Sequence, residues 1–131
     1  MLGSDGVTFA CTKVTTRHYY LHGGSAYAGR GYWMWMGLSG TYPGMQVSGV
    51  EVPLNYDYLV SLCWANPGFP GVNFFGTLDG NGQATASLSV QANLNYLDLT
   101  MYFTYVILSP GGGLPLAAAS NPVNATVTLY E

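Results

Sequence analysis

The chain has 131 residues, which suits one domain over residues 1–131 with a single hydrophobic core. Charged residues make up 7% of it, compared with about 25% in an average soluble domain. The three basic residues, Lys13, Arg17 and Arg30, are scattered, so they cannot neutralise a nucleic-acid backbone or bind an anionic membrane surface. Nucleic-acid binding and electrostatic membrane binding are therefore excluded.

Hydrophobic residues reach 49% and aromatic residues 15%, which is far from the composition of a disordered chain. No run approaches the roughly 18 apolar residues that a membrane-spanning helix needs. Solubility must depend on Ser, Thr, Asn and backbone groups, as it often does outside the cell. We therefore expect a secreted or cell-surface protein. Residues 1–10 contain no signal peptide pattern, so a secreted form would be a mature fragment or a cloned domain.

The two cysteines, Cys11 and Cys63, leave two alternatives open. In an oxidising compartment they could form a disulfide that closes a loop of about 52 residues. Equally, both could be small buried side chains, which free cysteine resembles. The sequence supplies no geometry that would choose between them.

Strand patterns dominate the first half of the chain. Residues 7–15 alternate between apolar and polar side chains, and residues 17–21 form a second extended run. Residues 32–37 are strongly β-prone, and a turn over residues 39–44 follows them. Residues 47–54 contain Gly49 and Pro53, so they indicate an edge strand or an irregular segment.

The segment over residues 56–64 fits a short helix and a strand equally well. Further on, residues 73–78 and 83–90 flank four turn-forming residues, which predicts a β-hairpin. The longest strand is expected over residues 97–108, with a loop over residues 109–115 and a last strand over residues 123–130. Together these elements predict an all-β, antiparallel β-sandwich, immunoglobulin-like or jelly-roll-like, with about seven or eight strands.

Several short motifs occur in a characteristic order, and each of them is turn-like. They are residues 26–30 (AYAGR), 37–44 (GLSGTYPG), 52–55 (VPLN), 75–86 (FGTLDGNGQATA) and 119–123 (ASNPV). In this order the chain resembles an uncharacterised β-domain from the C-terminal end of large secreted bacterial proteins. The resemblance covers about four-fifths of the chain and implies an extracytoplasmic β-sandwich without an assigned activity. The aromatic run over residues 32–36 and the two cysteines depart from that pattern.

No catalytic or metal-binding motif stands out, and we expect neither an enzyme nor a cofactor. The Gly-x-Ser-x-Gly pattern of serine hydrolases fails at Thr41, which replaces its last glycine. His18 and His22 are four residues apart, a spacing of about 13 Å on a strand, which is too far for one metal ion. Glu51 and Asp57 are the only close carboxylate pair, and no cleft is predicted around them.

The most informative feature is the aromatic content of the strands, which are apolar on both faces. In the run over residues 32–36, Trp33 and Trp35 face one way and Tyr32 the other, and Tyr102 and Tyr105 alternate similarly on the longest strand. A sandwich strand needs only one apolar face, so something must cover the second.

Three kinds of cover are open. A segment of the same chain could fold over the second face, such as the loop over residues 109–115 or the N-terminal segment. A second copy of the chain or another protein could pack there, since Trp and Tyr are favoured at interfaces. A glycan could stack on the rings. We expect a non-catalytic structural, assembly or adhesion module that uses these aromatic faces, with carbohydrate binding as the alternative.

Overall fold

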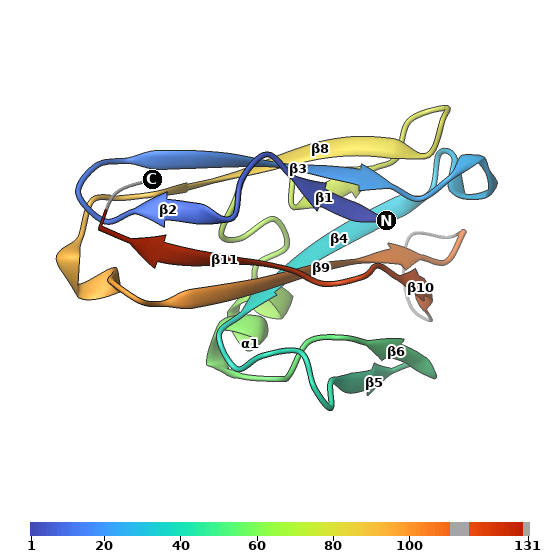
Figure 1. The fold of residues 1–131 in the computed structure, drawn as a ribbon. Coiled ribbons are helices and arrows are strands. Elements are labelled where there is room, and N and C mark those ends of the chain that lie inside the picture. The colour runs from blue at the N-terminus through green and yellow to red at the C-terminus, as the bar shows by residue number, and fades with distance from the viewer. Residues whose placement is uncertain (111–115, 130–131) are drawn as a thin grey trace.

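The computed structural model describes residues 1–110 and 116–129, and within them the chain is an all-β sandwich (Figure 1). One sheet contains three strands, β1 (Leu2–Ser4), β3 (Thr15–His22) and β8 (Gln83–Val90), in the order β1-β3-β8. The other contains six strands, in the order β2-β11-β9-β4-β7 with β10 also paired to β9. The expected sandwich is thus confirmed.

The six-stranded sheet is built around its two most apolar strands. Its members are β2 (Thr8–Ala10), β11 (Val123–Thr128), β9 (Thr100–Leu108), β4 (Gly31–Gly37), β7 (Phe75–Thr77) and β10 (Leu116–Ala119). Outside both sheets lie the hairpin strands β5 (Met45–Val47) and β6 (Val50–Val52), the helix α1 (Tyr58–Ala65), and the short 3-10 turns η1 (Ser25–Tyr27) and η2 (Leu94–Tyr96). The described residues therefore hold more strands than expected, because five of them are only three residues long.

The three-stranded sheet follows the alternation seen in the sequence. β3 and β8 pair antiparallel over eight residues, from Thr15 opposite Val90 to His22 opposite Gln83. Tyr19 and Leu21 are buried, while the residues between and beside them are exposed. This sheet has one core face and one polar face, because successive side chains of a strand point to opposite faces and here alternate between apolar and polar.

In the six-stranded sheet β9 is buried along nearly its whole length. It pairs antiparallel with β4 on one side, and on the other with β11 along its first half and β10 along its second half (Figure 1). Between β10 and β11 the buried hydroxyl of Ser120 accepts a hydrogen bond from the Tyr105 N–H at 3.0 Å. A side chain thus accepts the hydrogen bond of a β9 backbone N–H group at the point where the neighbouring strand is interrupted.

The two sheets meet through the inner face of β4 and β9. On this face each β4 side chain lies opposite a β9 side chain. The pairs are Tyr32 with Ile107, Met34 with Tyr105, and Met36 with Phe103. The Phe103 ring lies 4.6 Å from the Tyr19 ring of β3, centroid to centroid. These side chains form the core of the sandwich.

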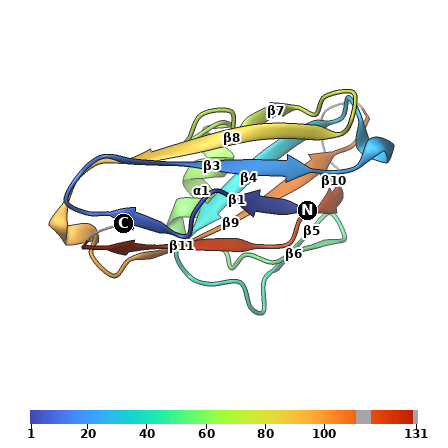
Figure 2. The same cartoon turned by 45° about the horizontal axis from the view of Figure 1, so that its top comes forward.

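The outer apolar face of β4 and β9 is covered by the chain itself, through residues 38–74. α1 packs on β4, and the β5–β6 hairpin lies beside β10 (Figures 1 and 2). Leu54, Val60 and Cys63 are fully buried there. The N-terminal segment is not this cover, because β1 belongs to the three-stranded sheet; the other expected cover, the loop over residues 109–115, lies largely outside the described residues.

Residues 56–64, which fitted a helix or a strand, form a helix because Asp57 caps it. The Asp57 carboxylate accepts a hydrogen bond from the Val60 N–H at 3.0 Å. Such a cap satisfies one of the N–H groups that have no partner inside a helix. No helix in the described part of the chain is long and apolar enough to cross a membrane.

The predicted hairpin over residues 73–90 is wrong. β7 pairs with β4 in the six-stranded sheet, whereas β8 pairs with β3 in the three-stranded sheet. The turn between them exists, because the Asp79 carboxylate accepts from the N–H groups of Asn81 and Gln83. It carries the chain from one sheet to the other instead of folding it back on itself.

Candidate functional site: an exposed aromatic cluster

Three of the five aromatic residues singled out in the sequence belong to the core. Tyr32, Trp35 and Tyr105 are each no more than 3% exposed, so they cannot contact a ligand at the surface. Trp33 and Tyr102 are half-buried. The prediction that all five form a working surface is therefore corrected, because residues 38–74 fold over the outer face and the two sheets close over the inner one.

The two core tyrosines have structural roles for their hydroxyls. Tyr32 Oη donates to the Asn73 carbonyl at 2.6 Å, and Tyr105 Oη donates to the Met1 carbonyl at 3.3 Å. Burial raises the pKa of both phenols, which keeps them neutral donors. These contacts tie distant segments together inside the fold.

Trp33 and Trp35 are nevertheless the centre of a chain of five aromatic rings, which we call the aromatic cluster. In order of contact its rings are Phe75, Trp33, Trp35, Trp64 and Tyr56. The centroids of successive rings are 5.8, 5.4, 5.4 and 5.2 Å apart, and the planes are inclined by 79°, 78°, 65° and 48°. Edge-to-face contacts at such distances add stability beyond the burial of area.

Different elements hold the rings of the aromatic cluster. β7 supplies Phe75 and β4 supplies both central tryptophans, in positions where strand residues of one parity share a face. α1 supplies Trp64, and Tyr56 precedes the helix. The sequence interpretation missed Phe75, Tyr56 and Trp64, although Asp57 followed by an apolar run is a helix-start signal that could have placed the last two together.

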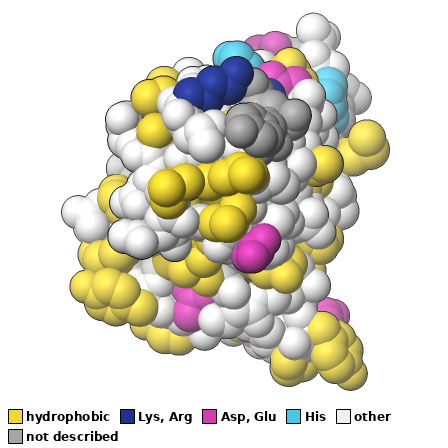
Figure 3. Space-filling model, turned by 60° about the vertical axis from the view of Figure 1, so that its left-hand side comes forward, with side chains coloured by type: hydrophobic (Ala, Val, Ile, Leu, Met, Phe, Trp, Pro, Cys, Tyr) yellow, Lys and Arg dark blue, Asp and Glu magenta, His cyan; other side chains and the backbone are white. Residues whose placement is uncertain are grey.

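The aromatic cluster is buried at its centre and exposed at its ends. Tyr56 is 55% exposed, Phe75 45% and Trp64 36%, whereas Trp35 is 1% exposed. The chain carries few charges, and these large apolar rings are exposed on its surface. A partner protein that buried them would gain the most binding free energy at this place. Figure 3 shows hydrophobic side chains in several patches on one side of the molecule, with few charged side chains between them.

The indole Nε1 atoms of Trp33 and Trp35 are buried and have no hydrogen-bond partner within the described part of the chain. Each such donor costs about 1–3 kcal/mol. Among the described residues no hydrogen bond from either indole therefore adds to the ring contacts at the centre of the aromatic cluster.

The histidines lie where the strand interpretation places them. Both are on β3, and His18 Nδ1 is 2.9 Å from an Asp5 carboxylate oxygen. Burial raises the pKa of Asp5, but hydrogen bonds from the His18 backbone and ring outweigh it and lower the pKa overall. Among the described residues no three His, Cys, Asp or Glu side chains are grouped to hold a metal ion.

Cys11 and Cys63 are free and buried. The structure therefore contradicts a disulfide between them and agrees with the alternative of two small buried side chains. Cys11 follows β2 at the edge of the six-stranded sheet, whereas Cys63 is a buried residue of α1. Cys63 Sγ is 3.7 Å from the Met36 carbonyl, and burial raises the pKa of its thiol. Both behave as small core side chains.

No protein-family model matches the chain, and no curated protein is significantly similar to it. The function must therefore be argued from the geometry of the chain itself.

Proposed function

We propose that this domain is a non-catalytic assembly or adhesion module that associates with a second copy, or packs on a partner protein, through the exposed rings of the aromatic cluster. The observation that carries the proposal is the set of three large rings, Tyr56, Trp64 and Phe75, exposed on one connected aromatic cluster. Trp and Tyr are among the side chains that most often dominate the binding energy of protein interfaces.

The edges of the three-stranded sheet are occupied, which favours a contact through the aromatic cluster over strand pairing at this sheet. On the outer edge of β8, Ser87 exchanges two backbone hydrogen bonds with Val72, and Gln83 exchanges bonds with Asp79. At the other edge, the Asn121 side chain bonds both backbone groups of Leu2, as a paired strand would. Edges occupied in this way offer few free groups to another chain.

Charge supports association as well. The net formal charge is −3, so copies of the chain repel one another weakly at long range. Charged residues are depleted in the cores of interfaces, and this chain has few anywhere.

The ring angles favour a protein partner over a sugar. A sugar stacks on a flat platform, but neighbouring rings in the aromatic cluster are inclined by 48° to 79°. Carbohydrate binding is therefore the alternative, and it is separated from assembly by the experiment below.

We also infer a location outside the cell or at its surface. The low charge supports this location, and so does the resemblance to a domain of large secreted bacterial proteins. The cysteines add nothing to the argument, since both are free.

The test is the particle mass from light scattering coupled to size-exclusion chromatography. We expect the wild-type chain to exceed its monomer mass of 14.0 kDa and the variant Tyr56→Gln/Trp64→Gln/Phe75→Thr to elute as a folded monomer. Tyr20→Thr is the matched control, because Tyr20 is 39% exposed on the three-stranded sheet, away from the aromatic cluster.

Association that persists in the triple variant would contradict the proposal. A wild-type monomer that binds a glycan array, with binding lost in the triple variant, would replace assembly by carbohydrate binding.

A further inference from the structure

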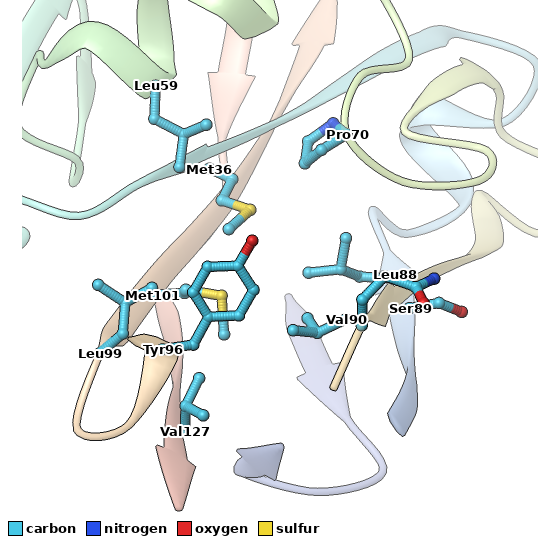
Figure 4. Close-up of a pocket in the computed structure, with 11 residues that line it drawn as sticks. Met36, Leu59, Pro70, Leu88, Ser89, Val90, Tyr96, Leu99, Met101 and Val127 are labelled. Carbon is cyan, nitrogen blue, oxygen red and sulfur yellow. The ribbon is translucent and has the colours of Figure 1, made fainter. Parts of the chain in front are cut away.

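A cavity of about 260 Å³ lies between the two sheets, at the end of the sandwich where residues 91–99 cross from one sheet to the other (Figure 4). Met36 of β4, Met101 of β9 and Val127 of β11 line it from the six-stranded sheet, and Leu88 and Val90 of β8 from the other sheet. The inner side chains Met36, Leu88, Met101 and Val127 are all buried. The cavity is thus a recess that opens to the surface and has core side chains at its floor.

The cavity opens where its lining becomes polar. Ser89, Gln91 and Tyr96 are the exposed members of the lining, and they form its rim. The hydroxyl of Tyr96 points towards Met36 (Figure 4). The cavity therefore has a hydrocarbon and thioether interior with one hydroxyl aimed into it.

The lining chemistry defines which ligand can enter. Within the described part of the chain no charged residue lines the cavity, so an ionised group would lose its hydration without gaining a counter-charge. An apolar engineered cavity of about 150 Å³ stays dry and binds benzene, so a cavity of 260 Å³ accommodates a larger hydrocarbon body. Two flexible methionine side chains allow the walls to adjust to its shape.

We propose that this cavity is a binding site for a small uncharged molecule whose body is hydrocarbon, of about two fused rings in size, and whose single polar group hydrogen-bonds to Tyr96. The site is independent of the proposed assembly function. Met36 faces inward from β4, while its neighbour Trp35 faces outward into the aromatic cluster.

The test follows the isotope-labelled methyl groups of the five methionines by NMR during titration with naphthol. The Met36 and Met101 signals should shift and saturate, while the Met45 signal, from β5 outside the sandwich, should not move. Naphthalenesulfonate has a similar body but carries a charge, and it should cause no saturable shift.

Two variants locate the site. Val90→Phe fills the cavity and should weaken naphthol binding at least about tenfold, whereas Val7→Phe, at an exposed position, should leave it unchanged. Tyr96→Phe keeps the ring and removes the hydroxyl, so binding should weaken by about threefold to tenfold.

Unchanged naphthol binding in Val90→Phe, shifts spread over all methionines, or equal binding of the sulfonate would overturn the proposal. If Val90→Phe does not fold, as an altered Met45 signal would show, the exposed-ring variant Tyr96→Phe decides the matter: binding equal to wild type overturns the proposed polar contact and the site with it.

Discussion

At the scale of single residues, Asp57 connects the helix of the covering segment to the sheet beneath it. One carboxylate oxygen accepts from the Val60 N–H inside α1, and the other accepts from the Leu38 N–H at 2.7 Å and from the Ser39 hydroxyl at 2.8 Å. Leu38 and Ser39 directly follow β4. One side chain thereby fixes where α1 begins and how it lies against β4, which sets the position of Trp64 over Trp35.

Removing this carboxylate should destabilise the fold. Asp57→Ala is expected to lower the free energy of unfolding by about 2 kcal/mol at neutral pH, because a helix cap and two further hydrogen bonds are lost together. Urea denaturation followed by tryptophan fluorescence measures the change. Glu51→Ala, at an exposed position on β6, should change the same quantity by less than about 0.5 kcal/mol.

The effect of Asp57 should also depend on pH. Burial raises the pKa of Asp57, but the hydrogen bonds from Leu38, Val60 and Ser39 outweigh it and leave the pKa below its usual value. A lowered pKa in the folded state stabilises the fold above the unfolded-state pKa of about 4, and this stabilisation is lost as pH falls through the folded-state pKa. The difference between wild type and Asp57→Ala should therefore shrink in acid, and a difference that is constant down to pH values well below about 4 would contradict this role.

At the scale of elements, the turn after β7 brings the start of β8 against the chain that follows β3. Gly82 has a φ of +75°, and a Cβ atom there would collide with the Gly24 carbonyl oxygen. Gly23 donates to the Gly82 carbonyl at 2.8 Å, so the chain beyond β3 and the start of β8 lie against each other. Only glycine allows this approach at a positive φ.

Gly82→Ala should therefore lower the free energy of unfolding by about 2 kcal/mol or more, through both the strained φ and the collision. Gly80→Ala is the matched control two residues earlier in the same turn. A Cβ atom at Gly80 meets nothing within 4 Å, so its urea midpoint should stay near that of wild type. Equal effects of the two substitutions would show that the approach of Gly82 to Gly24 is not what orients β8.

The long strands could be predicted from the sequence because their alternation is local. β3, β4, β9 and β11 all lie where the apolar pattern places them. Pairing is not local: the turn over residues 79–82 has hairpin chemistry, yet the strands that flank it find partners in β4 and β3. Turn residues specify a reversal of the chain, whereas the choice of sheet depends on the packing of distant side chains.

The candidate site was predicted only in part, for a related reason. The sequence showed correctly that β4 is apolar on both faces and that something covers the outer one. The cover is made by residues 38–74, which contain short strands, a two-turn helix and irregular backbone, so no period marks them as a layer. Which rings remain exposed depends on how that segment lies, and this is why Trp35 is buried while Tyr56 and Trp64 reach the surface.

At the scale of the whole molecule, the sandwich presents two apolar features of different kinds. The aromatic cluster lies on the outer face of the six-stranded sheet, and its exposed rings suit a contact with another protein. The cavity lies between the sheets, is lined by flexible side chains and suits a small molecule. The occupied edges of β1 and β8 leave few free backbone groups for strand pairing along the three-stranded sheet.

The most direct test of the central claim locates the contact between molecules by amide hydrogen exchange, read by mass spectrometry in dilute and in concentrated solution. The account predicts that exchange slows on concentration within residues 56–66 and 73–77, which carry the exposed rings, and stays unchanged in β3 and β8. Slowing confined to β3 and β8, or no slowing in a sample that light scattering shows to be associated, would contradict it.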